Sequence, residues 1–159
     1  MKKKKRLLFV CLGNICRSPA AEGVMKAVVR KYGNADEWLI DSAGTGNYHI
    51  GDLPDSRMRK AGARRGYLFN HRARQLNTGD FRDFDMIIGM DANNVNNIKR
   101  LAPTADDEAK VYPMAKWLDP DGGYDYVPDP YYEGAEGFEL VLDQLEYACK
   151  RLFDDIQSH

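Results

Sequence analysis

The chain has 159 residues, and its 23 lysines and arginines nearly balance its 24 aspartates and glutamates. This length predicts one domain, residues 1–159, with its own core. The balanced charge argues against nucleic acid or a membrane surface as partner, and no stretch is long enough to span a membrane. Cysteines at positions 11, 16 and 149 fit neither a disulfide framework nor a zinc site, which favours a cytoplasmic location.

Apolar runs predict strands that alternate with helices along the chain. Strands are expected at residues 7–10, 38–40, 84–89 and 110–112, and helices at residues 19–32, 54–65, 92–101 and 135–156. A small, flexible run is expected at residues 42–46, and a long loop rich in proline, glycine and aspartate at residues 118–132. This order predicts an α/β three-layer sandwich, with a four-stranded parallel sheet and helices on both faces. Ligands of such sheets bind beyond the carboxyl ends of the strands.

The first predicted strand leads into a loop that has the character of a phosphate site. Its sequence is Cys11-Leu12-Gly13-Asn14-Ile15-Cys16-Arg17, followed by Ser18-Pro19. A loop that closes onto a helix N-terminus points backbone N–H groups at one spot, where the helix dipole favours an anion. Arg17 adds a planar guanidinium suited to two phosphate oxygens. Because the same field stabilises a thiolate, we expect Cys11 to be a nucleophile aimed at phosphorus.

A buried core cysteine with an unrelated surface arginine is the alternative interpretation of this spacing. The context argues against it, because an apolar strand precedes the loop, Gly13 permits tight backbone geometry and Ser18-Pro19 is typical of a helix start. A nucleotide-binding loop is excluded, since no Gly-Lys-Ser/Thr sequence follows Gly13 at the required spacing.

The long loop offers a proton donor for the leaving group of a phosphate monoester. Asp129 stands in the sequence Asp129-Pro130-Tyr131-Tyr132, where proline stiffens the chain and two aromatic rings provide walls for a flat leaving group. An ordinary turn is the alternative interpretation of this sequence. Three other aspartates compete for the same role in a looser, glycine-containing stretch: Asp119, Asp121 and Asp125.

These two motifs, together with Asp41-Ser42-Ala43-Gly44-Thr45, resemble the low-molecular-weight protein tyrosine phosphatases in the family's order and over essentially the whole chain. The resemblance implies that Cys11 forms a phosphocysteine intermediate and that Arg17 and the loop N–H groups stabilise the transferring phosphoryl group. It implies that Asp129 protonates the leaving oxygen and then activates water, while Ser18 hydrogen-bonds the thiolate. Phosphotyrosine-containing proteins are the implied substrates and inorganic phosphate the product, with no metal and no cofactor.

The same resemblance implies further site residues. Substrate-binding positions are Leu12, Gly13, Asn14, Ile15, Cys16, Tyr48, Tyr131 and Tyr132. Asn14, Ser42 and His71 would hold the loop through hydrogen bonds, and asparagine tolerates the left-handed backbone that a strained loop needs. Cys16 would form a reversible disulfide with Cys11, although simple packing within the loop is its alternative role. Cys149 is expected in the core, on the apolar face of the last helix.

Three other functions compete with phosphotyrosine hydrolysis as interpretations of this sequence. Arsenate reductases with this loop carry further cysteines between Cys16 and Cys149, and this chain has none there. Protein arginine phosphatases of this type carry threonine at the position of Ile15 and a different aromatic pattern after the Asp-Pro sequence. A phosphate-binding module without turnover predicts a missing nucleophile or acid, but both Cys11 and Asp129 are present.

Overall fold

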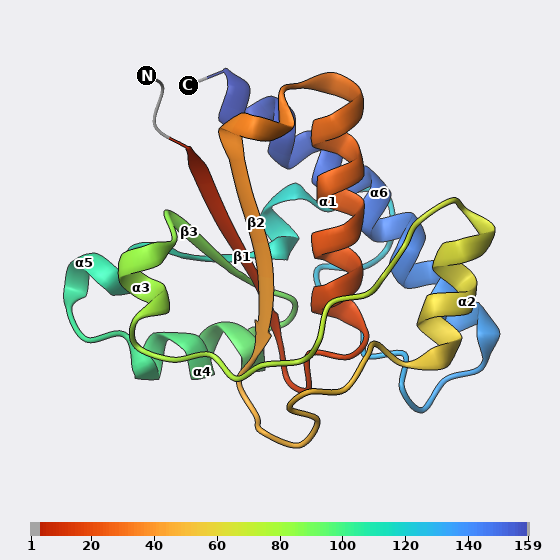
Figure 1. Cartoon of the computed structure of the whole chain (residues 1–159), viewed down its shortest axis with the longest axis horizontal. Helices are drawn as coiled ribbons and strands as arrows, with labels where there is room; N and C mark the ends of the chain where they lie inside the picture. The colour runs from red at the N-terminus through yellow and green to blue at the C-terminus, as the bar shows by residue number, and fades with distance from the viewer. Residues whose placement is uncertain (1–3, 159) are drawn as a thin grey trace.

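A computed structural model describes residues 4–158 of the chain. Its strands are β1 (Lys5–Cys11), β2 (Trp38–Gly44), β3 (Met86–Gly89) and β4 (Val111–Pro113), as Figure 1 shows. Its longer helices are α1 (Arg17–Tyr32), α2 (Ser56–Arg64), α4 (Ala92–Leu101) and α6 (Ala135–Gln157). Four short elements of about one turn each complete the structure: α3 (Asp80–Asp83), α5 (Ala105–Glu108), and the 3-10 turns η1 (Ala35–Glu37) and η2 (Met114–Trp117).

The strands form one parallel sheet in the order β2-β1-β3-β4, which confirms the predicted architecture. Strand β1 is central, and its Leu7 lies opposite Ile40 of β2 and Met86 of β3. The segment after Cys11 therefore leaves the middle of the sheet at its carboxyl edge, where ligands of such sheets bind.

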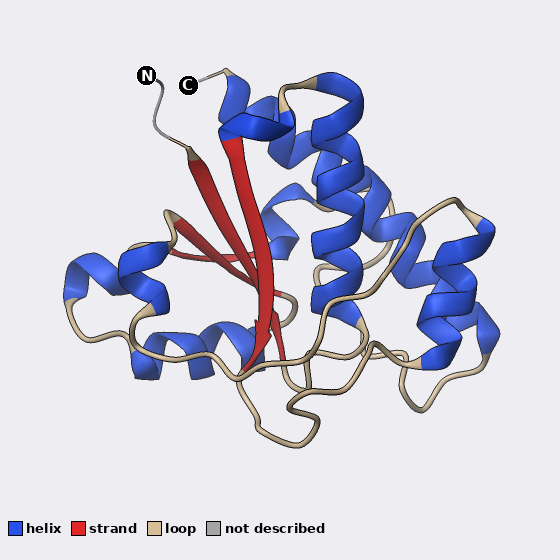
Figure 2. Cartoon of the chain, viewed as in Figure 1, coloured by secondary structure: helices blue, strands red, loops and turns tan. Residues whose placement is uncertain are grey.

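Helices cover both faces of the sheet, with α1 and α6 on one face and α3 and α4 on the other (Figure 2). Because successive side chains of a strand point to opposite faces, Leu7 and Phe9 join the core cluster beneath α1 and α6, whereas Leu8 and Val10 join the cluster beneath α3 and α4. Every one of these four side chains is buried. The central strand is thus fixed from both sides before the loop begins.

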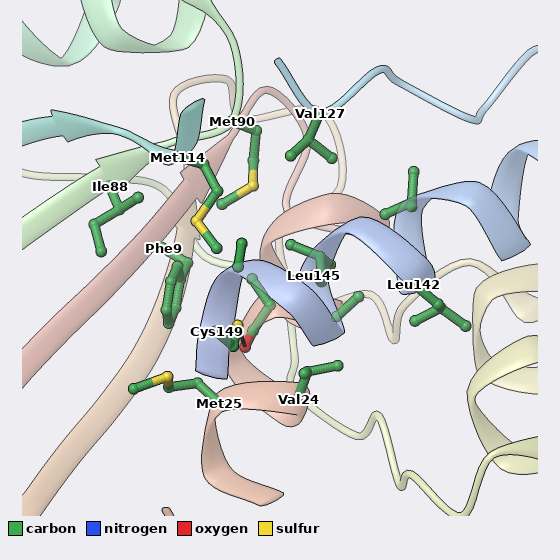
Figure 3. Packing of buried hydrophobic residues seen from close by; sticks show 14 of the residues in the cluster. Phe9, Val24, Met25, Ile88, Met90, Met114, Val127, Leu142, Leu145 and Cys149 are labelled. Atoms are coloured by element: carbon green, nitrogen blue, oxygen red, sulfur yellow. Dashed lines mark hydrogen bonds between the residues drawn. The ribbon is translucent and has the colours of Figure 1, made fainter. Parts of the chain in front are cut away.

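The larger core cluster joins the sheet to α1 and α6. Figure 3 shows Phe9 of β1 near Cys149 of α6 and Met25 of α1, and Ile88 of β3 and Leu145 of α6 belong to the same cluster. Cys149 is fully buried, as its position on the apolar face predicted. Among the described residues no helix is long and apolar enough to cross a membrane.

Two predictions from the sequence need correction. The run expected to be flexible at residues 42–46 is strand up to Gly44, because β2 pairs with β1 from Trp38 opposite Lys5 to Gly44 opposite Cys11. The helix expected to begin at residue 19 begins at Arg17, directly at the end of the phosphate loop. The sequence does not predict the four single turns, since one helical turn is too short to show the periodic apolar pattern of a helix.

Candidate active site

The loop of residues 12–16 connects the end of β1 to the start of α1. Neighbouring segments hold its carbonyl groups: Thr45 N–H donates to the Cys11 oxygen at 2.9 Å, Gly46 N–H to the Leu12 oxygen at 2.9 Å, and Asp55 N–H to the Ile15 oxygen at 2.8 Å. These bonds fix the loop from three positions along its length.

Cys11 and Ser18 meet at the base of this loop. The Cys11 sulfur lies 3.0 Å from the Ser18 hydroxyl oxygen, and both residues are buried. The same oxygen accepts a hydrogen bond from Asn14 Nδ2 at 2.7 Å, and its own proton has two acceptors in reach: the sulfur at 3.0 Å and the Ala43 carbonyl oxygen at 3.4 Å. The geometry predicted for Ser18 from the family resemblance is therefore present.

Asn14 lies at the centre of a network behind the loop. Its backbone adopts φ 58°, the left-handed region that asparagine tolerates better than most residues. Its Nδ2 donates to the hydroxyls of Ser18 at 2.7 Å and Ser42 at 3.1 Å. Its Oδ1 lies 2.9 Å from His71 Nε2 and accepts the backbone N–H of Arg74 at 3.0 Å. The side chain of Asn14 thus uses all of its hydrogen-bonding capacity to hold the strained turn.

Arg17 is held rigidly in the pocket that Cys11 also lines. Its side chain is only 4% exposed; Nη1 donates to Asp91 Oδ2 at 2.7 Å and to the Val127 carbonyl at 3.0 Å, while Nη2 lies 3.9 Å from Asp129 Oδ2. Burial opposes the charge of Arg17, but Coulombic attraction to Cys11 and the bond to Asp91 outweigh it, so its pKa is raised. The guanidinium is a fixed, permanent cation at the phosphate loop.

A pocket of about 410 Å³ opens over the loop and contains most of the predicted residues. Its walls are formed by Cys11, Leu12, Gly13, Ile15, Cys16, Arg17, Tyr48, His49, Asp129, Tyr131 and Tyr132. The rings of Tyr131 and Tyr132 meet edge to face at 5.0 Å, and Tyr132 is 90% exposed. The pocket therefore has the Cys11 thiol and the Arg17 cation at the loop, and aromatic side chains that extend to solvent.

Ser18, Asn14, Ser42 and His71 do not line this pocket; they belong to the hydrogen-bonded network already described. Asn14 was expected to bind substrate as well as to support the loop. Its side chain is completely buried and supports the loop, and its part in substrate binding stays a prediction.

The structure also separates Asp129 from its competitors. Asp129 lines the phosphate pocket, and its Oδ1 accepts the backbone N–H of Tyr131 at 3.0 Å, which fixes the turn. Asp119 and Asp125 line a different hollow, and Asp121 bonds through its backbone N–H to Asp119 Oδ1 at 2.9 Å. Among these four aspartates only Asp129 reaches the pocket.

Cys16 lies in the same pocket, and its thiol holds its proton strongly. Burial raises its pKa, and the negative charges of Asp55 and of Cys11 add to the effect. Because its pKa is raised, Cys16 is a protonated thiol at neutral pH.

His49, which lines the pocket, and Asp91, which lies outside it and binds Arg17, make contacts that the sequence did not suggest. His49 packs against the loop so closely that a Cβ added to Gly13 would lie 3.1 Å from its ring. Asp91 was predicted only as a helix cap; its Oδ1 does accept the N–H of Asn94 at 2.8 Å, and its Oδ2 binds Arg17 as well. Asp91 follows β3, the neighbour of β1, so the sheet order alone would have placed it near Arg17.

Comparison with known proteins decides the family. Residues 6–159 match the family model of the low molecular weight phosphotyrosine protein phosphatases. The chain belongs to this family. Its members are cysteine-dependent hydrolases, which agrees with the buried thiol at the end of β1.

Individual members of the family resemble the chain over nearly its whole length. The low molecular weight phosphotyrosine protein phosphatase of Schizosaccharomyces pombe is 45% identical over 146 residues, which are 91% of this chain and 92% of that one. A protein tyrosine phosphatase structure from Entamoeba histolytica aligns with a TM-score of 0.93 at 42% identity and covers 98% of both chains. A Drosophila arginine phosphatase structure aligns with a TM-score of 0.86 at 31% identity, over 99% of this chain and 98% of that one.

Proposed function

We propose that the protein hydrolyses phosphotyrosine in proteins, and aryl phosphates, through a phosphocysteine intermediate. The observation that carries the proposal is the convergence of Cys11, Arg17 and Asp129 in one pocket whose outer walls are aromatic. Tyr48, Tyr131 and Tyr132 line the pocket and suit a flat aromatic leaving group better than the short side chain of phosphoserine.

In the first step the Cys11 thiolate attacks phosphorus, so that an S–P bond forms while the bond from phosphorus to the aryl oxygen breaks. The guanidinium of Arg17 and the N–H groups at the start of α1 stabilise the three non-bridging oxygens of the phosphoryl group. Protonated Asp129 gives its proton to the departing phenoxide. This transfer matters because a phenol has a pKa of about 10 and its anion is a poor leaving group near neutral pH.

In the second step water attacks the phosphocysteine, and the carboxylate of Asp129 accepts the proton of that water. The S–P bond breaks, inorganic phosphate forms, and Cys11 leaves as a thiolate. The Ser18 hydroxyl, 3.0 Å from the sulfur, donates to the thiolate and stabilises it as it leaves. Neither step calls on a metal or a cofactor.

Cys16 suggests a protective role under oxidation. Peroxide converts the Cys11 thiolate to a sulfenic acid; the Cys16 thiol then condenses with it, which forms a disulfide and releases water. A protonated Cys16 is not itself oxidised readily, because oxidation proceeds through the thiolate. A nucleophile with this sensitivity fits a reducing compartment, and we place the protein in the cytoplasm as a single-domain enzyme.

Parallel assays with phosphotyrosine, phosphoserine and phosphoarginine peptides in the presence of EDTA test this proposal. We expect turnover of the phosphotyrosine peptide by the natural protein, loss of turnover in Cys11→Ser, and full turnover in the matched control Cys149→Ser, which alters a thiol outside the pocket. Preferred turnover of the phosphoarginine peptide would instead assign the substrate class of the Drosophila relative. Phosphate binding without turnover of any peptide would make the protein a binding module.

A further inference from the structure

Helix α2 begins beside the phosphate loop. Asp55, the residue before the helix, donates its backbone N–H to the Ile15 oxygen of the loop at 2.8 Å. Figure 1 shows α2 beside the start of α6, and Cζ of Arg57 lies 4.8 Å from the centroid of the Phe138 ring of α6. The first turn of α2 is therefore fixed next to the pocket.

Arg57 connects this helix to the aromatic wall of the pocket. Its Cζ lies 5.3 Å from the ring centroid of Tyr131, which lines the pocket. Its Nε and Nη2 donate to the two carboxylate oxygens of Asp55, at 3.0 and 2.8 Å. The side chain of Asp55 is 10% exposed and that of Arg57 is 47% exposed. This ion pair thus turns its positive end to solvent at the mouth of the pocket.

Lys60 and Arg64 extend the positive charge of Arg57 along α2. Residues spaced by three and four positions lie on the same side of a helix, so these three side chains form a row, which we call the basic stripe. All three are exposed. Within residues 4–158, neither Lys60 nor Arg64 has an ion pair or a side-chain hydrogen bond. Two of the three charges are therefore free to bind an anionic partner.

The acidic side chains of α6 are paired with a different cation. Arg65, directly after α2, lies 2.9 Å from Glu139, 2.9 Å from Asp143 and 2.6 Å from Glu146, measured between guanidinium nitrogens and carboxylate oxygens. Successive residues around a helix axis point about 100° apart, so Arg65 and these carboxylates lie on another side of α2 from Arg64. The basic stripe keeps its own charge.

We propose that the basic stripe binds acidic side chains that flank the phosphotyrosine of a protein substrate, on one side of it along the chain. This inference rests on the proposed phosphatase function. The stripe spans about 10 Å from Arg57 to Arg64, a length that an extended peptide covers in about three residues. Because Arg57 lies against Tyr131, the stripe starts at the pocket. The acidic residues should stand about one to four positions from the phosphotyrosine.

The stripe acts on substrate binding rather than on the chemical steps. An exposed ion pair strengthens binding by up to about fivefold, so two or three of them should raise kcat/KM by about tenfold through a lower KM. Exposed charges are screened by salt, so this gain should fall as the ionic strength rises. A small aryl phosphate does not reach Lys60 or Arg64 and should gain nothing from them.

Steady-state kinetics with phosphotyrosine peptides of equal length tests the proposal. One peptide carries glutamates before the phosphotyrosine, one carries them after it, one is neutral and one carries lysines. We expect the natural protein to favour one of the two acidic peptides over the neutral one by about tenfold in kcat/KM. Combining Lys60→Ala with Arg64→Ala should remove this preference and leave kcat and KM for p-nitrophenyl phosphate unchanged. Arg57 is left in place, because its loss would also disturb Tyr131.

A matched control combines Arg30→Ala with Lys31→Ala, which removes the same two charges from the last turn of α1, at the opposite end from the phosphate loop. It should keep the preference for the acidic peptide. Raising the salt from about 0.01 M to about 1 M shortens the Debye length from about 30 Å to about 3 Å and should abolish the preference.

Binding of the same peptides to the Cys11→Ser protein, followed by calorimetry, measures the preference without turnover. Failure to hydrolyse any aryl phosphate would contradict the proposed function, whereas the peptide affinities would still test the stripe. An equal gain from both acidic peptides, or a preference that survives in the variant with Lys60→Ala and Arg64→Ala, would overturn the inference. Binding to phosphatidylserine vesicles through Lys60 and Arg64, with no preference among the peptides, would assign the stripe to a membrane surface and overturn it as well.

Discussion

The Ser18 hydroxyl lies 3.0 Å from the sulfur of Cys11 and is oriented there by Asn14. A hydrogen bond of this kind is worth most when the sulfur is an anion, both before attack and again as the leaving group in hydrolysis of the phosphocysteine. Ser18 therefore connects the buried network behind the loop to the proposed chemistry in front of it.

Ser18→Ala should slow hydrolysis of the phosphocysteine more than its formation. A hydrogen bond to a charged group is worth about 1.5–3 kcal/mol, which corresponds to a loss of about 10- to 100-fold in the second step. Stopped-flow measurements with an aryl phosphate should then show a burst of phenol followed by slow turnover. Ser158→Ala, which alters an exposed serine at the end of α6, is the control and should behave as the natural protein. Equal rates for Ser18→Ala and the control would contradict the role of Ser18.

Asp129→Asn should lower kcat by about 10²–10⁴ for phenyl phosphate, the usual worth of general acid-base catalysis. The rate of phosphocysteine formation should fall less with p-nitrophenyl phosphate, because p-nitrophenoxide is a better leaving group and depends less on a proton from Asp129. Asp119→Asn, a change at a competing aspartate outside the pocket, should keep its activity. A similar loss for both leaving groups in the rate of the burst would argue against proton donation by Asp129.

Two substitutions of Asn14 separate backbone strain from hydrogen bonding. Asn14→Ala keeps a side chain at φ 58° and strips the partners of Ser18, Ser42 and His71, so we expect a loss of unfolding free energy of more than about 2 kcal/mol. Asn14→Gly relieves the strain and should recover about 1 kcal/mol of that loss, but not the activity. Urea denaturation and kcat for both variants provide the measurements. Recovery of activity in Asn14→Gly would show that conformation, rather than the network, is what the loop requires.

Asp91 has two separable contacts, because one oxygen caps α4 and the other binds Arg17. Asn is as good a helix cap as Asp, so Asp91→Asn should keep the cap while it removes the ion pair. We expect weaker inhibition by inorganic phosphate in Asp91→Asn, because Arg17 is no longer held in place, with little change in Tm. Asp91→Ala should lose a further ~1 kcal/mol of stability with the cap. Unchanged phosphate affinity in both variants would show that Arg17 needs no help from Asp91.

The proposed disulfide predicts how peroxide inactivates the protein. The natural protein treated with peroxide should recover its activity after addition of a thiol reductant. Cys16→Ser should recover much less, because the Cys11 sulfenic acid then proceeds to irreversible forms. Cys149→Ser serves as the control and should recover fully, since Cys149 is buried in the core. Equal recovery in Cys16→Ser and the natural protein would rule out the protective disulfide.

Local sequence was enough to predict the parts of the site that lie close together along the chain. The apolar run before Cys11 and the helix start at Ser18-Pro19 predicted a strand, a loop and a helix, and the structure has them in that order. The small side chains of residues 42–44 predict flexibility, but these residues belong to β2. They are small because the loop approaches closely: a Cβ on Gly44 would lie 2.7 Å from the Leu12 oxygen.

Contacts between residues far apart in the chain could not be predicted from local sequence patterns. Glu22 and Arg74 carry no motif, yet both belong to the network around Asn14 and His71, because α1 and the segment after residue 70 meet behind the loop. Glu22 follows Ser18 by one helical turn, so it shares a face of α1 with the loop, and that spacing was a usable signal. His49 had no such signal, since only the folded chain brings it against Gly13.

The phosphocysteine is the central claim, and rapid acid quench of a reaction with labelled aryl phosphate tests it most directly. The proposed mechanism predicts phosphate attached covalently to the peptide that contains Cys11, in an amount that approaches one per chain in Ser18→Ala, and no label in Cys11→Ser. Label on another residue, or full turnover with no protein-bound phosphate at any time, would contradict it.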